Sequence, residues 1–90
     1  MLKNMYVIHD ITAEVYTDPF LGVNDQTAIR TCQNLVQNPG TTFYDNSEDF
    51  RLYKIGTYNE ETAAISTHNP VLIVRLSDLL IKKYDHEEGN

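Results

Sequence analysis

Hydrophobic positions at the start of the chain follow the two-residue period of strands. Residues 5–10 (MYVIHD) form a β-branched and aromatic run between polar residues, which is typical of a strand. Residues 13–17 (AEVYT) alternate, with Glu14 and Tyr16 opposite the smaller side chains, and this favours a half-exposed strand. The short link between the two runs predicts a hairpin, and Pro19 ends its second strand.

A helical period replaces this alternation over Asn24–Gln37. Apolar side chains recur there at intervals of three and four residues, as a single stripe made of Ala28, Ile29, Cys32, Leu35 and Val36. The side-chain oxygen of Asn24 can accept a hydrogen bond from the first turn, and Pro39 and Gly40 end the helix. We therefore expect one main helix with one buried face.

Strand patterns return in the second half of the chain. Three segments carry them, separated by turn residues: Phe50–Tyr58, Ala63–Ser66 and Val71–Leu76. Residues 41–49 predict a loop with a single helical turn that starts at Asn46 or Ser47. Gly56 within a strand indicates a bulge or a close approach of another backbone. Residues 77–84 fit either a short terminal helix or an extension of the last strand, and the periodicity does not decide between them.

These elements follow the order β-β-α-β-β-β. Hairpins favour an antiparallel sheet of four or five strands with the helix on one face, which is an α+β fold. The chain of 90 residues predicts one domain over residues 1–84 and a disordered acidic tail over residues 85–90. A domain of this size has a thin core, so we also expect a homo-oligomer.

Charge restricts the classes of partner. Seven Lys and Arg against 13 Asp and Glu give a net charge of −6, which excludes a strong general affinity for duplex DNA. Asp85, Glu87 and Glu88 supply three of these six charges, so the body of the domain is only mildly acidic and can hold a local basic patch.

The cysteine content and the hydropathy of the chain indicate the compartment in which we expect the protein. The single cysteine, Cys32, provides neither a disulfide framework nor a CxxC metal motif, which favours a reducing compartment. No apolar run approaches the roughly 18 residues of a membrane span, and the apolar part of the N-terminus is too short for a secretory signal. We expect a soluble, intracellular protein with no membrane partner.

The groups that usually carry catalysis do not combine into a site. His9 and Asp10 adjoin at a strand end without a nucleophile, which is typical of a hydrogen-bonded turn histidine. Cys32 lies on the apolar stripe, where a thiol is inert. The neighbouring carboxylates lie in turns, as solvated charges usually do: Glu48, Asp49, Glu60 and Glu61. We therefore predict no enzyme activity, no cofactor and no metal.

One stretch, EDFRLYKIGTYNEET at residues 48–62, combines cations with aromatic rings. Exposed rings beside cations on a sheet are what single-stranded nucleic acid binds. The candidate contacts come from this stretch and its expected neighbours: Arg51, Tyr53, Lys54, Tyr58, Tyr16 and Arg75. Strict alternation puts Tyr53 on one face and Lys54 and Tyr58 on the other. The alternative is that one face packs its tyrosine against the helix while Lys54 extends its charged end to water.

Landmark residues recur in a fixed order over most of residues 5–75. Those of the first half are Asp10, Ala13, Tyr16, Pro19, Phe20, Ala28, Arg30 and Pro39. Those of the second half are Phe43, Glu48-Asp49-Phe50, Leu52-Tyr53, Ile55-Gly56, Tyr58-Asn59 and Thr62-Ala63. In this order the chain resembles the small nonstructural protein of gokushovirus-type microviruses, single-stranded DNA phages, a protein often labelled DNA-binding. The departures are Ser47 in place of Pro, Asn59 in place of Asp, Ala63 in place of a turn Gly and Cys32 at a helix position often held by an aromatic residue. Residues 77–90 have little counterpart in the family.

The resemblance implies a role in handling a viral genome in the cytoplasm of an infected bacterial host. Related microviruses use such a protein to move replication from duplex copying to single-strand synthesis coupled to packaging. Binding of single-stranded DNA, by a homodimer that gathers cations from two copies, is one mechanism. An acidic adaptor that docks onto the replication initiator or procapsid without touching DNA is the alternative. A host-encoded α+β regulator with an accidental likeness is a third interpretation.

Overall fold

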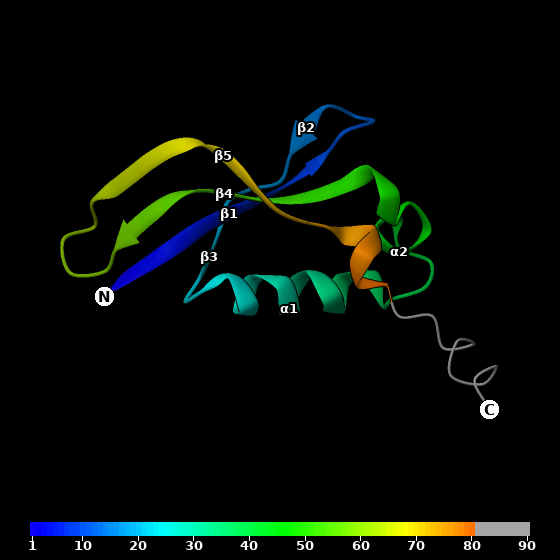
Figure 1. The fold of residues 1–90 in the computed structure, drawn as a ribbon, viewed down its shortest axis with the longest axis horizontal. Coiled ribbons are helices and arrows are strands. Elements are labelled where there is room, and N and C mark those ends of the chain that lie inside the picture. The colour runs from blue at the N-terminus through cyan, green and yellow to red at the C-terminus, as the bar shows by residue number, and fades with distance from the viewer. Residues whose placement is uncertain (81–90) are drawn as a thin grey trace.

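The computed structural model, which describes residues 1–80, is a five-stranded antiparallel sheet with one main helix along one side (Figure 1). The strands are β1 (Leu2–Asp10), β2 (Val15–Tyr16), β3 (Phe20–Gly22), β4 (Phe50–Asn59) and β5 (Ile65–Arg75). They follow the order β2-β1-β4-β5, and β3 also pairs with β1. This arrangement confirms the expected α+β class.

The N-terminal hairpin forms as expected but with a shorter second strand. His9 lies opposite Tyr16, while Glu14 belongs to the turn with a φ of 61°. After Pro19 the chain returns along β1 as β3, a strand that the sequence does not predict. Its pairing with β1, rather than an alternating pattern of its own, makes these three residues a strand.

The segment after β4 also differs from the prediction. The sequence predicts strands at 63–66 and 71–76 with a loop between them, but β5 runs through the whole segment. Gly56 lies opposite Thr67 and Lys54 opposite Val71, so residues 68–70 of β5 match a single residue of β4. Because β5 pairs with β4 on both sides of Asn69 and Pro70, these residues form a bulge within the strand instead of the predicted loop.

Helix α1 (Asp25–Val36) begins as the sequence predicts. The Oδ1 of Asn24 accepts a hydrogen bond from the N–H of Thr27 at 2.9 Å and caps the first turn. The expected helical turn at Ser47 is the 3₁₀ turn η1 (Ser47–Asp49), and a further short helix, α2 (Thr42–Asp45), precedes it. A second 3₁₀ turn, η2 (Leu76–Leu79), follows β5, whereas residues 81–84 and the predicted tail at 85–90 lie outside the described residues.

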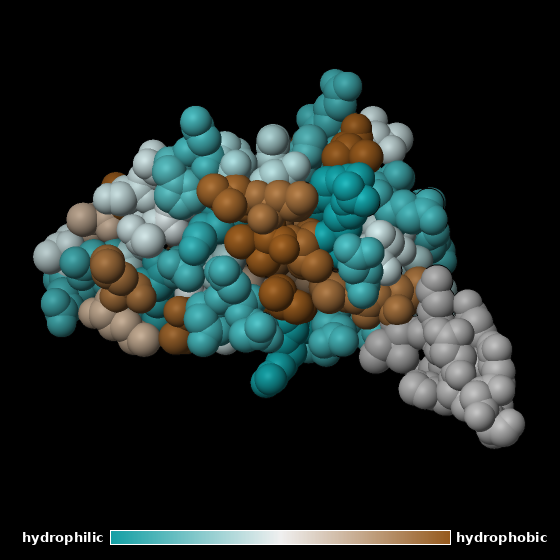
Figure 2. Space-filling view, viewed as in Figure 1, coloured by the Kyte–Doolittle hydropathy of each residue, from teal (hydrophilic) through white to brown (hydrophobic). Residues whose placement is uncertain are grey.

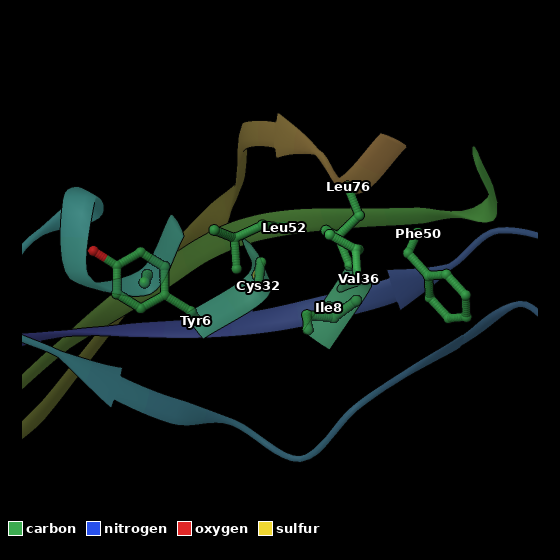
Figure 3. Packing of buried hydrophobic residues seen from close by; sticks show 8 residues of the cluster. Tyr6, Ile8, Cys32, Val36, Phe50, Leu52 and Leu76 are labelled. Carbon is green, nitrogen blue, oxygen red and sulfur yellow. The ribbon is translucent and has the colours of Figure 1, made fainter. Parts of the chain in front are cut away.

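The hydrophobic core lies between the sheet and α1. Alternate residues of β1 and β4 point toward the buried stripe of the helix, and η2 closes one end (Figure 3). The buried members are Tyr6, Ile8, Ala28, Cys32, Val36, Phe50, Leu52 and Leu76. The helix therefore covers one face of the sheet, and among residues 1–80 no other helix of comparable length covers the opposite face.

Gly56 lies at the irregular part of the β4–β5 pair, which confirms the expected close approach. A Cβ atom at this position would lie 2.1 Å from the carbonyl oxygen of Ser66, so any side chain forces the two backbones apart. We expect Gly56→Ala to lower the free energy of unfolding by about 2–3 kcal/mol, measured by urea denaturation.

Gly40→Ala is the comparison for that prediction. A Cβ at Gly40 meets no atom within 4 Å, and only its positive φ of 92° disfavours alanine. We expect this variant to lose about 1 kcal/mol. If both variants unfold at the same urea concentration, the close approach at Gly56 does not limit stability.

Candidate nucleic-acid interface

The sheet has an outer face, the face that points away from α1. Tyr6 and Ile8 of β1 are buried against the helix. Because successive residues of a strand point to opposite sides, Val7 and His9 belong to the outer face. Tyr53 lies opposite Val7 in β4 and so shares that face.

Four side chains form a row across the outer face. Tyr16 lies opposite His9, His9 opposite Arg51, and Arg51 opposite Arg75, so the row crosses β2, β1, β4 and β5 in turn. Neighbouring strands are about 4.8 Å apart, and directly opposite residues point to the same side. We call Tyr16, His9, Arg51 and Arg75 the outer-face row.

Three aromatic rings gather at one end of this row. The rings of His9 and Tyr16 stack with centroids 4.1 Å apart and planes 15° from parallel. The ring of Tyr53 lies 6.2 Å from His9 and 6.4 Å from Tyr16. Tyr16 is 51% exposed, so the stack stands on the surface with ring area free for another planar group.

Two arginines form the other end of the row. Arg51 and Arg75 lie directly opposite each other on adjacent strands, a placement of like charges that destabilises a sheet. An Nη of Arg51 donates to the backbone oxygen of Glu48 at 3.1 Å, and within residues 1–80 no carboxylate lies within salt-bridge distance of either guanidinium. A bound anion would relieve the repulsion between them.

Lys54 does not join the row. It lies opposite Tyr6, on the side of the sheet that faces α1, and its Nζ is 3.8 Å from Oδ1 of Asp25. The alternative interpretation is thus right that Lys54 lies on the side of the helix, but neither Tyr53 nor Tyr58 packs against α1, because both lie on the outer face.

Tyr58 lies on the outer face but at the far end of the sheet. The bulge at Ile55 shifts the alternation of β4, so Tyr58 shares the side of Tyr53, contrary to strict alternation. Its cross-strand neighbour is Lys3, whose Nζ lies 2.8 Å from Oε2 of Glu60 and lowers the pKa of that carboxyl. The structure thus brings together four of the six predicted residues, Tyr16, Arg51, Tyr53 and Arg75.

His9 is the member that sequence reasoning missed. The sequence places His9 near the end of the predicted strand at 5–10 and favours a hydrogen bond in the turn, whereas in the structure its ring stacks on that of Tyr16. The alternation of MYVIHD already places His9 two residues after Val7, on the side opposite Tyr6. Combined with the predicted hairpin, that spacing could have paired His9 with Tyr16.

Among residues 1–80, the one cysteine of the chain lies in the core, away from the outer face. Cys32 is fully buried, and burial raises the pKa of its thiol to about 12, as expected for an inert thiol. Within residues 1–80 no three His, Cys, Asp or Glu side chains lie close enough to hold a metal ion. In the same range, no helix has the length and apolar character needed to cross a membrane.

Comparison with known proteins identifies the family. No curated protein and no solved structure matches the chain. A family model described as Phage ORF5 protein matches residues 3–79, which include the whole outer-face row. The expected phage origin is therefore confirmed, and the chain belongs to the Phage ORF5 protein family.

Proposed function

We propose that this phage protein binds single-stranded DNA on the outer face of its sheet, during replication or packaging of the phage genome. The observation that carries the proposal is the outer-face row, which puts stacked rings beside two arginines that have no carboxylate partner among residues 1–80, on the face that points away from α1. The cytoplasm of the infected host is where such a protein would act.

The chemistry of the row suits an unpaired strand better than a duplex. Bases of single-stranded DNA can stack on the exposed ring of Tyr16, whereas those of a duplex are already stacked inside it. In this proposal Arg51 and Arg75 contact backbone phosphates beside the stacked base. Because each phosphate contact contributes about −0.7 to the slope of log affinity against log salt, two arginines give a slope near −1.4 per chain.

Fluorescence anisotropy with labelled oligothymidylate, repeated over a range of salt concentrations, tests the proposal. We expect Arg51→Ala to weaken binding about tenfold, which corresponds to about 1.4 kcal/mol, and to reduce the salt slope by about 0.7. Lys54→Ala is the matched control, because it removes an equal charge from the same strand on the opposite side of the sheet. We expect it to leave the affinity unchanged.

Two results would contradict DNA binding by the row. One is the absence of binding even at low salt. The other is an equal effect of Arg51→Ala and Lys54→Ala, because a general loss of positive charge would then explain the change.

The second proposal is an acidic adaptor that docks onto the replication initiator or procapsid. The charge distribution supports it, since Lys3 and Lys54 are already paired with carboxylates and the chain carries a net charge of −6. Pull-down of the tagged protein from infected cells, after nuclease treatment, would recover a viral partner if this mechanism operates. A preparation without any viral protein would exclude it.

A further inference from the structure

The outer edge of the sheet at β5 is long and carries no acidic residue. Among residues 1–80 only β4 pairs with β5, so the other side of this strand presents unpaired backbone N–H and C=O groups. Its sequence, ISTHNPVLIVR, has no Asp or Glu, although the chain contains 13 of them. An exposed edge of this kind is a template for pairing with another strand.

Only the second half of β5 is suited to such pairing. In the first half the bulge at residues 68–70 distorts the strand, and Pro70 has no N–H to donate, which are two common ways to protect an edge. The second half, Val71–Arg75, has a smaller irregularity at Ile73 that increases the twist and removes no donor. The accessible edge is therefore the segment VLIVR, which we call the β5 edge segment.

The β5 edge segment exposes two of its four apolar side chains, whereas Ile73 and Val74 are partly buried against the core. Val71 is 50% exposed and Leu72 is 47% exposed. Figure 2 shows apolar atoms gathered in the middle of the molecule, where β5 passes above α1 in Figure 1, with hydrophilic atoms on either side. A patch of this kind on a small soluble domain marks an interaction site.

The opposite edge of the sheet offers no equivalent. It is formed by β2 and β3, which have two and three residues, and short edge strands resist strand addition. The long accessible edge of this sheet is therefore the one at β5.

A second copy of the chain is the partner that this edge fits. Two chains of net charge −6 repel each other over most of their surfaces, but they can meet without repulsion along a segment that holds no carboxylate. Arg75 is the one charged residue of the segment, so the segment offers little to a partner that is recognised by charge. Antiparallel pairing of a strand with its own copy is self-complementary under two-fold symmetry.

We propose that the protein forms a homodimer in which the β5 edge segments of two copies pair antiparallel and join the two sheets. The two-fold axis is then perpendicular to the sheet, and the outer faces of both copies lie on the same side. Arg51 and Arg75 of the two chains are brought onto one surface, so the outer face of the dimer carries four arginines where the outer face of one chain carries two. The dimer itself does not depend on whether this surface binds DNA.

Sedimentation equilibrium of the full chain without DNA, over a range of concentrations, tests the proposal. We expect a mass that rises toward twice the 10.3 kDa of one chain. Leu72→Glu puts a carboxylate on the edge segment and is expected to raise the dissociation constant roughly tenfold or more. Val23→Glu is the matched control, since Val23 is 50% exposed but lies outside the strands, and this variant should dimerise like the wild type.

Single cysteines placed one at a time at residues 71–75 test the orientation independently of the Leu72→Glu variant. Two-fold pairing brings a residue near the axis opposite its own copy, with Cβ atoms about 4–5 Å apart, which is close enough for a disulfide. We expect oxidation to cross-link one or two neighbouring positions in this range and not Ser66→Cys. The natural Cys32 is buried and gives little background.

A protein that stays monomeric at all concentrations would overturn the proposal. A dimer that survives Leu72→Glu and forms no cross-link within residues 71–75 would also overturn it, because its interface would lie elsewhere. Neither result bears on oligothymidylate binding by one chain, so this proposal and the proposed function fail separately.

Discussion

Raising the pH from 9 to 12 is expected to unfold the protein. Burial raises the pKa of Cys32 from 9.0 to about 12. Burial also raises the pKa of Tyr6 from 10.0 to about 12, assisted by the hydrogen bond that its hydroxyl donates to Asp25 at 2.6 Å. Cys32 and the ring of Tyr6 are buried, and the Tyr6 hydroxyl lies at the partly exposed edge of the core. The folded chain therefore holds both protons more tightly than the unfolded chain does.

The sign of the effect follows from proton linkage. Where the folded pKa exceeds the unfolded one, the stabilisation is fully present below the unfolded pKa and is lost as the pH rises toward the folded pKa. For Cys32 this window is pH 9 to 12, and for Tyr6 it is pH 10 to 12. At about 1.4 kcal/mol per pKa unit, Cys32 alone removes on the order of 4 kcal/mol, a large part of the stability of a small domain. Tyr6 adds less than its pKa shift suggests, because its hydroxyl lies at the partly exposed edge of the core.

Urea denaturation followed by circular dichroism at intervals from pH 7 to pH 11.5 measures this loss. Tyr6→Phe should flatten the dependence above pH 10, and Cys32→Ala should flatten it from pH 9 upward, although each variant starts from a lower stability at pH 7. Tyr44→Phe is the control for loss of a hydroxyl, because Tyr44 is exposed. A midpoint that does not change from pH 8 to pH 11.5 would contradict the prediction.

Leu52→Ala is expected to lower the free energy of unfolding by about 3–5 kcal/mol. Leu52 has no exposed surface and lies on the side of β4 that faces α1, within the cluster that contains Cys32 and Leu76 (Figure 3). Truncation leaves a cavity at the centre of the contact between sheet and helix. A thin core has few other side chains that can shift to fill it.

Leu21→Ala is the matched control for Leu52→Ala. The same side chain is shortened on β3, where Leu21 is 44% exposed, so a loss of about 0.5 kcal/mol is expected. Both are measured by urea denaturation at neutral pH. Equal losses in the two variants would show that burial in this core does not govern stability.

The helix was predictable because its signals are local. The stripe that contains Ala28, Cys32 and Val36 is also the buried face of α1, and the cap at Asn24 acts within its own turn. Residues three or four positions apart on a helix meet whatever the rest of the chain does. Gly56 was predictable for a similar reason, since a glycine within a strand pattern seldom has another purpose than close approach.

The boundaries of the strands were less predictable because pairing decides them. Asn69 and Pro70 usually form a turn. Here β5 runs through both residues because the segments before and after them both pair with β4. Phe20–Gly22 has no strand pattern but becomes β3 beside β1. In both places a neighbouring strand distant in sequence overrides local preference.

The α+β class, the buried stripe of α1 and the presence of cations and rings along β4 all follow from local patterns in the sequence. It did not determine which of these side chains meet. One bulge at Ile55 brings Tyr58 to the side of Tyr53, while Lys54 stays on the side of α1. The outer-face row, in contrast, depends on the tertiary structure. Its four residues come from four strands, and their register is set by pairing across the sheet and not by any local pattern.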